Sequence, residues 1–150
     1  MKVVIDTNIL ISGASDENSR AFKIINEVIE GRVEAFANYQ TIGENRQMLR
    51  KLVKDREYRE LLERFFDNVQ EVRVFKKLHV VSDPEDNKLI ESAAASGADY
   101  LITQDTAVLD LEKYNKTQIV TPDEFWAKYK ADSSGDDSAW GDWGKMLLGG

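Results

Sequence analysis

The chain has 150 residues and no cysteine, so it can form one domain with a full core, while disulfide frameworks, thiolate metal sites and cysteine nucleophiles are excluded. Its formal net charge is −7, the opposite of what a nucleic-acid-binding protein usually carries. No stretch approaches the length of a membrane span and the amino terminus lacks a signal-peptide pattern, so we expect a soluble, cytoplasmic protein with no membrane partner.

The first strand ends in a carboxylate. Residues 3–5 are apolar without alternation, which predicts a strand buried on both faces of a parallel sheet. Asp6 follows at the carboxyl end, where open α/β sheets bind ligands. A carboxylate at the edge of the core is costly unless it is paired or metal-bound, so we favour a functional role for Asp6 over that of a simple turn. Thr7 and Asn8 are expected to brace it by hydrogen bonds.

Strand and helix patterns alternate along the rest of the chain. After a loop over residues 12–18, the expected helices are 19–30, 40–53, 55–69 and 83–97, a short turn at 108–111 and a last helix capped by 121–124. The expected strands are 33–37, 72–74 or 78–81, 100–103 and 118–120. This alternation predicts an α/β fold with a mainly parallel sheet. The single histidine, His79, lies in an apolar run, so we expect it to be packed in the core or at its edge.

The negative charge is unevenly distributed. Residues 131–150 form a linker and an acidic tail with a net charge of −3, which leaves −4 for a predicted domain over residues 1–130. Trp140 and Trp143 in the tail suit a segment that docks on a partner or on the domain itself, and a floppy terminus is an equal alternative. Within the domain, basic residues are concentrated at 46–77, where solvated helix surface and phosphate contacts are both open interpretations.

Carboxylates are the only candidates for catalysis, because the sequence contains no serine elbow, phosphate-binding loop, dinucleotide fingerprint or second histidine. Asp6 and Asp105 follow strands, whereas Glu44 and Asp86 lie in the first turns of expected helices. Strand ends and helix starts share one edge of a parallel α/β layer, so these four side chains are expected to converge. Converging carboxylates repel one another unless a cation neutralises them, and oxygen ligands alone select Mg²⁺ or Mn²⁺.

Each of these carboxylates also has a purely structural interpretation. Asp86 lies at a position where acids cap helices, and Asp105 can cap the short helix behind it. Glu44, taken alone, is typical of a solvated helix surface. Only the combination indicates a site.

Several stretches share their order and spacing with one known family. They are Val4-Ile5-Asp6-Thr7-Asn8-Ile9-Leu10, Glu44 ahead of Met48-Leu49, Asp83-Pro84-Glu85-Asp86-Asn87-Lys88, Ala98-Asp99-Tyr100-Leu101-Ile102-Thr103-Gln104-Asp105 and Ile119-Val120-Thr121-Pro122-Asp123-Glu124-Phe125. Over residues 2–130 the chain resembles the PIN-domain family, in particular its branch of toxins from toxin–antitoxin pairs. It departs from the family at Gln104, where Gly or Arg is frequent, and in the tail, which the resemblance does not cover.

The resemblance implies a three-layer α/β/α fold and a metal-dependent ribonuclease that cuts single-stranded RNA. The implied acidic quartet, which would hold the metal and act in catalysis, is Asp6, Glu44, Asp86 and Asp105. The implied supporting residues are Thr7, Asn8 and Thr103. A homodimer and an antitoxin partner are further expectations from the family.

The sequence therefore favours a Mg²⁺- or Mn²⁺-dependent endoribonuclease, with Glu44 holding the metal directly or through water. The candidate RNA-binding residues are Arg46, Arg50 and Lys88. The alternative is a non-cleaving RNA- or protein-binding module on a PIN-like fold. The complete set of four costly carboxylates argues against that alternative.

Overall fold

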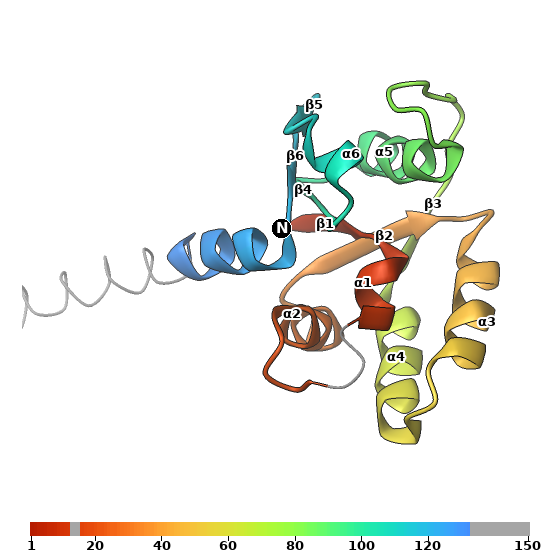
Figure 1. Cartoon of the computed structure of the whole chain (residues 1–150), viewed down its shortest axis with the longest axis vertical. Coiled ribbons are helices and arrows are strands. Elements are labelled where there is room, and N and C mark those ends of the chain that lie inside the picture. Colours follow the sequence, from red (N-terminus) through yellow and green to blue (C-terminus); the bar gives the residue numbers. More distant parts are fainter. Residues whose placement is uncertain (13–15, 133–150) are drawn as a thin grey trace, which may run out of the picture.

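A six-stranded sheet forms the centre of the protein, which a computed structural model describes at residues 1–12 and 16–132. Its strands are β1 (Lys2–Ile5), β2 (Glu34–Asn38), β3 (Gln70–Val72), β4 (Tyr100–Ile102), β5 (Lys113–Tyr114) and β6 (Thr117–Val120). They lie in the order β3-β2-β1-β4-β6-β5 (Figure 1). All neighbouring strands are parallel except β5 and β6. Five strands therefore bring their carboxyl ends to one edge of the sheet.

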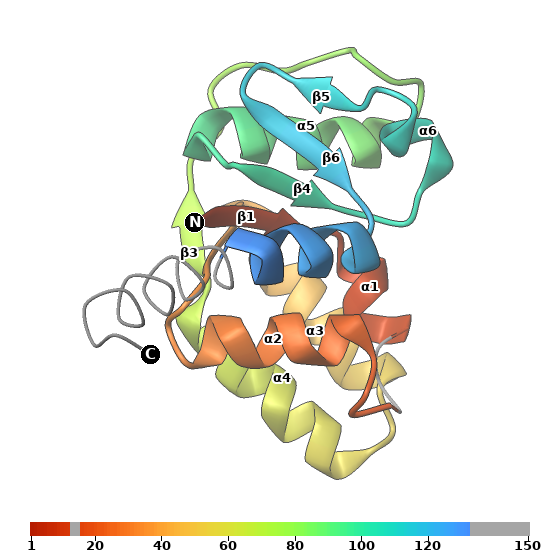
Figure 2. The same cartoon turned by 90° about the vertical axis from the view of Figure 1, so that its left-hand side faces the viewer.

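Helices cover both faces of this sheet (Figures 1 and 2). They are α1 (Thr7–Ser12), α2 (Arg20–Ile29), α3 (Ile42–Leu52), α4 (Arg56–Asn68), α5 (Pro84–Ser96), α6 (Thr106–Leu109) and a last helix over residues 122–132. Val3 faces a core shared with α1 to α4 and the last helix, and Val4 faces a second core with α5 and α6. Both valines are buried, as expected for a strand covered on both faces. The predicted three-layer α/β/α fold is confirmed.

Helix boundaries follow the local capping signals. The Ser19 hydroxyl accepts a hydrogen bond from the Phe22 amide at the start of α2. Asp83 accepts one from the Glu85 amide and Pro84 takes the first position of α5. The same helix ends at Gly97, whose φ of 65° is the left-handed conformation that glycine adopts without strain.

The structure differs from the sequence-based expectations mainly in the shortest elements. Residues 7–12 form α1 and residues 113–114 form β5, and neither was expected, because such short segments show no readable periodicity. The third strand lies at 70–72, earlier than either predicted position, and 78–81 is a loop.

One further expectation is changed at a single residue. His79 is exposed, so the expectation of a packed position was wrong: its neighbours Leu78 and Val80 turn toward the core and leave it facing solvent. The last helix continues to Asp132, the final residue that the structure describes. The predicted docking segment of the tail lies outside the described residues. Within the described part of the chain, none of the helices has the length and apolar character needed to cross a membrane.

Candidate active site

A cavity of about 600 Å³ opens at the carboxyl edge of the sheet. The ends of β1 and β2 form its floor, and the first turns of α1, α3 and α5 surround it. The predicted residues that line it are Asp6, Thr7, Asn8, Glu44, Asp86, Lys88 and Asp105. Positions far apart in the sequence therefore meet here, because parallel strands end and helices begin at the same edge.

Asp6 and Asp105 are joined through a buried hydroxyl. The Thr103 hydroxyl, fully buried at the end of β4, donates to Asp6 Oδ2 over 2.9 Å. The same hydroxyl oxygen accepts the Asp105 backbone amide at 3.1 Å. Thr103 does not itself line the cavity, but it determines the orientation of Asp6 and the position of the Asp105 backbone.

Both aspartates also cap helices. Asp6 Oδ1 accepts the Asn8 amide at 3.1 Å, and Asp105 Oδ1 accepts the Ala107 amide at 2.9 Å. Capping and a role in the cavity are thus compatible, because a carboxylate oxygen that accepts one hydrogen bond keeps a further lone pair. Among the described residues, Asp6 receives no hydrogen bond from the side chains of Thr7 or Asn8, so the expected side-chain bracing is replaced by a backbone amide and by Thr103.

Asp86 carries the strongest electrostatic signal of the site. It is 9% exposed in the first turn of α5. Burial, followed by repulsion from Asp105 and Asp83, raises the pKa of Asp86 to about 6. A carboxyl that is hard to ionise beside other carboxylates indicates a site whose negative charge a bound cation would balance.

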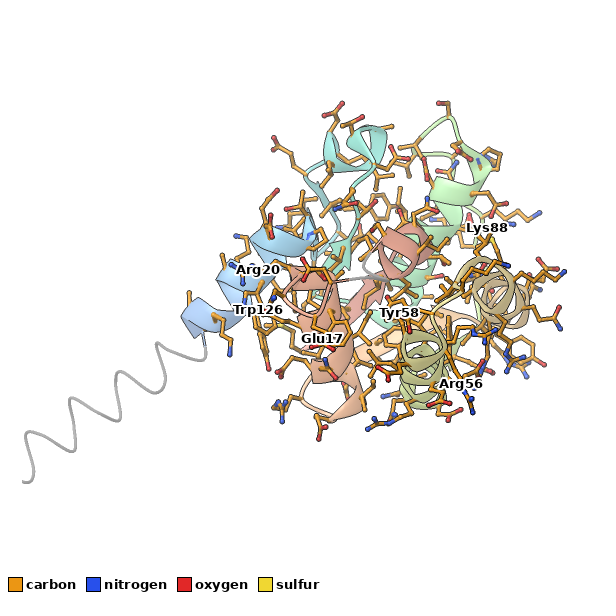
Figure 3. All side chains as sticks on the ribbon, turned by 60° about the horizontal axis from the view of Figure 1, so that its bottom comes forward. Glu17, Arg20, Arg56, Tyr58, Lys88 and Trp126 are labelled. Atoms are coloured by element: carbon orange, nitrogen blue, oxygen red, sulfur yellow. The ribbon has the colours of Figure 1, made fainter. Side chains whose placement is uncertain are left out.

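The remaining predicted residues differ in how they relate to the cavity. Glu44 is exposed at its rim. Lys88 extends from α5 on the side nearest α3 (Figure 3), with its Nζ 2.9 Å from Glu85 Oε1. Arg46 and Arg50 lie outside the cavity and form ion pairs with Glu63 of α4.

Glu63 neutralises much of the positive charge of these two arginines. Hydrogen bonds from Arg50 and Arg46 lower the pKa of Glu63 to about 2, against the opposing effect of burial. A second carboxylate, Asp67, lies 2.8 Å from Arg46. The arginines are therefore engaged in holding α3 to α4, and any phosphate contact would compete with these pairs.

Two residues of the site region were not assigned a role from the sequence. Asn38, at the end of β2, lines the cavity, and its Oδ1 accepts the Gln40 amide at 2.8 Å. The strand-end rule that identified Asp6 applies to it equally. Asn87, beside Asp86, is buried and holds the loop at Val80 and Val81. The sequence feature that could have identified Asn87 is its position within the Asp83–Lys88 stretch.

The donor set fits a hard divalent cation, since it consists of carboxylate oxygens that repel one another. In residues 1–12 and 16–132, no three acidic or histidine side chains are already close enough to hold an ion. Binding would therefore draw the carboxylates together from their present positions, and the exposed side chain of Glu44 has the most freedom to move.

Comparisons with known proteins agree with this fold. A family model described as PIN domain matches residues 2–107, and the chain belongs to that family. The fold is similar to that of a chain in the crystal structure of VapBC2 from Rickettsia felis bound to a DNA fragment from their promoter. The TM-score is 0.52 with 11% sequence identity, over 79% of this chain and 97% of that chain. No curated protein matches.

Proposed function

We propose that the protein is a Mg²⁺- or Mn²⁺-dependent endoribonuclease that cleaves single-stranded RNA. The observation that carries this proposal is the convergence of Asp6, Glu44, Asp86 and Asp105 on one cavity, with the pKa of Asp86 raised to about 6. PIN domains as a family are generally nucleases, and the carboxylates of this chain occupy the edge where parallel α/β sheets bind ligands.

In this mechanism Asp6, Asp86 and Asp105 would hold the metal directly, and Glu44 directly or through water. A bound divalent ion supplies an activated water and stabilises the charge that develops on the phosphate. Thr103 keeps Asp6 oriented throughout, because its hydroxyl is fully buried and already bonded to both neighbours. Lys88, at the cavity wall, is better placed than Arg46 or Arg50 to contact a phosphate.

The deciding experiment is cleavage of a mixed-sequence single-stranded RNA with Mn²⁺, with Mg²⁺ and with EDTA. Wild type should cut only with metal, and Asp6→Asn should lose cleavage while its thermal midpoint stays unchanged or rises, because one of the mutually repelling charges is removed. Asp110→Asn is the matched control, since Asp110 is exposed and lies outside the cavity. A clear loss of folding in Asp6→Asn would instead show a structural role.

A biological role as the toxin of a toxin–antitoxin pair extends this proposal. This role is supported by the fold that the protein shares with a chain of the VapBC2 structure. If the protein is such a toxin, its protein partners would be an antitoxin and a second copy of the chain. Expression of the wild type should arrest growth, and expression of Asp6→Asn should not. If wild type binds RNA but cuts it with neither metal, the non-cleaving binding module is the better description.

A further inference from the structure

An exposed cation–π pair lies beside the cavity, where β2 and β3 end. Asn38 and Val72 are register partners at the ends of these strands, and the Tyr39 amide donates to the Val72 carbonyl at 2.8 Å. The Arg73 guanidinium lies 4.9 Å from the centre of the Tyr39 ring, which is 51% exposed. Because Asn38 lines the cavity, this pair is one residue away from its wall.

The segment that continues from Arg73 is aromatic and basic. Phe75 is 92% exposed, the largest exposure among the large apolar side chains of the described residues. Lys76 and Lys77 follow it and are also exposed. A single exposed apolar residue needs no explanation. Here the exposed phenylalanine is flanked in the sequence by Arg73, Lys76 and Lys77, and Arg73 also contacts the exposed Tyr39 ring. This combination of aromatic and basic groups is more specific than an isolated apolar side chain.

Both ends of this segment are held in place. Before it, β3 pairs with β2. After it, the Leu78 amide donates to Glu91 Oε2 at 3.0 Å, and Asn87 accepts the Val80 and Val81 amides at 2.9 and 3.0 Å. Residues 73–77 are therefore displayed from a fixed base on the sheet and α5, which reduces the conformational entropy lost on binding a ligand.

We propose that Tyr39, Arg73, Phe75, Lys76 and Lys77, here called the platform, bind a stretch of single-stranded RNA that runs out of the cavity. Proteins that bind single strands combine aromatic rings, on which bases stack, with cations that contact the backbone. The platform supplies both kinds of group on exposed residues at or just after the ends of β2 and β3. This inference rests on the proposed ribonuclease function, and it assigns the contacts to nucleotides beyond the scissile phosphate.

Charge favours RNA over a protein as the occupant. The cavity is surrounded by carboxylates, so attraction of a polyanion needs positive charge nearby, and the Lys88 charge is already paired with Glu85. The centres of protein–protein interfaces are depleted in lysine, whereas the platform has two lysines and an arginine around one phenylalanine. The platform also explains how a chain with a net charge of −7 can bind a polyanion.

The test is binding of a fluorescein-labelled, mixed-sequence single-stranded RNA to the full chain in EDTA, followed by fluorescence anisotropy. Phe75→Ala should weaken binding by about fivefold to a hundredfold, the contribution of one stacked base. Lys76→Glu with Lys77→Glu should weaken it further and reduce the slope of log K against log salt by about 0.7 for each phosphate that the protein no longer neutralises.

The double variant Lys113→Glu with Lys128→Glu is the control for the change in net charge alone. These lysines are exposed, and Lys113 is on β5, the edge strand farthest from β3. Unchanged RNA affinity in the Phe75 and lysine variants, or an equal loss in this control, would overturn the platform. A change of oligomeric state in Phe75→Ala with RNA affinity unchanged would show instead an interface between copies of the chain.

Failure of the platform is distinguishable from failure of the nuclease. Binding in EDTA requires no cleavage, so platform variants can lose affinity whether or not the protein cuts. If wild type cuts with Mn²⁺ and the platform variants bind as tightly as wild type, only the platform is wrong. If wild type binds no RNA in EDTA, the platform is wrong, and cleavage with Mn²⁺ decides separately whether the protein is a nuclease.

Discussion

Thr103 illustrates how one uncharged side chain organises a group of charged ones. Its hydroxyl donates to Asp6 and accepts from the Asp105 amide, and it is fully buried. Asp6 therefore has one oxygen held by Thr103 and the other by the Asn8 amide. Asp86 has the opposite environment, since burial and neighbouring carboxylates disfavour its charged form. The surroundings of Asp86 therefore favour its neutral form.

The raised pKa of Asp86 has a consequence for stability. Its folded-state pKa of about 6 lies above the ordinary value of 3.8, so ionising Asp86 destabilises the metal-free protein increasingly as pH rises from 4 through 6. We expect Asp86→Asn to raise the free energy of unfolding by about 3 kcal/mol at neutral pH and to change it little at pH 4. Urea unfolding in EDTA at both pH values, followed by circular dichroism, measures this.

The comparison with Asp110→Asn separates this effect from a general loss of negative charge. Asp110 is exposed, and its replacement should leave stability unchanged at both pH values. An Asp86→Asn protein less stable than wild type at neutral pH would contradict the electrostatic account of Asp86.

At the scale of elements, α5 connects the cavity to the platform. Its first turn carries Asp86, and the next residue, Asn87, makes three hydrogen bonds to the loop at Val80 and Val81. One turn later Glu91 holds the Leu78 amide. The helix thus carries a candidate metal ligand at the cavity and also holds the loop over residues 73–83 in place.

Asn87→Ala tests this anchoring. The change removes the acceptor of two backbone amides and the donor to the Val81 carbonyl, so we expect a loss of about 1–3 kcal/mol in the free energy of unfolding. Native-state hydrogen exchange should quicken at Val80 and Val81. Asn68→Ala is the control, because Asn68 is exposed and bonds only to its own helix, at the Arg64 carbonyl. Equal effects of the two changes would contradict an anchoring role.

Elements with strong local signals were predicted well, and those without them were missed. The caps at Ser19 and Asp83 and the stop at Gly97 involve neighbouring residues only, so the sequence displays them directly. The six residues of α1 and the two of β5 contain too few positions for a pattern, and they form because the surrounding elements pack against them. Tyr58 of α4 is labelled in Figure 3. Its hydroxyl, for example, donates to the Leu10 carbonyl of α1.

For the whole molecule, the parallel sheet is what gathers the site. Metal binding at its edge should therefore stabilise the entire fold, since an ion that binds only the folded state adds its binding free energy to that of folding. Mn²⁺ at about a hundred times its dissociation constant should add about 2.7 kcal/mol, a rise of about 5–10 °C in the thermal midpoint. Differential scanning fluorimetry with and without EDTA measures it.

The pH dependence of this rise in thermal midpoint tests whether the metal binds at the cavity. The proposed metal would bind the ionised form of Asp86. Because the pKa of Asp86 is about 6, protons compete below that value, and the shift should be smaller at pH 5 than at pH 7.5. Asp6→Asn should reduce the shift at both pH values. A shift that is the same in wild type and Asp6→Asn would place the metal elsewhere.

By itself, the sequence determined the fold class, most helix boundaries and the four carboxylates at strand ends and helix starts. These features depend on burial patterns and caps that are local in the chain. The tertiary structure decided which side chains meet: the bond between Thr103 and Asp6 across 97 positions, and the ion pairs that engage Arg46 and Arg50 with Glu63. It also decided that Phe75 faces solvent, because the exposure of a side chain depends on how distant elements pack around it.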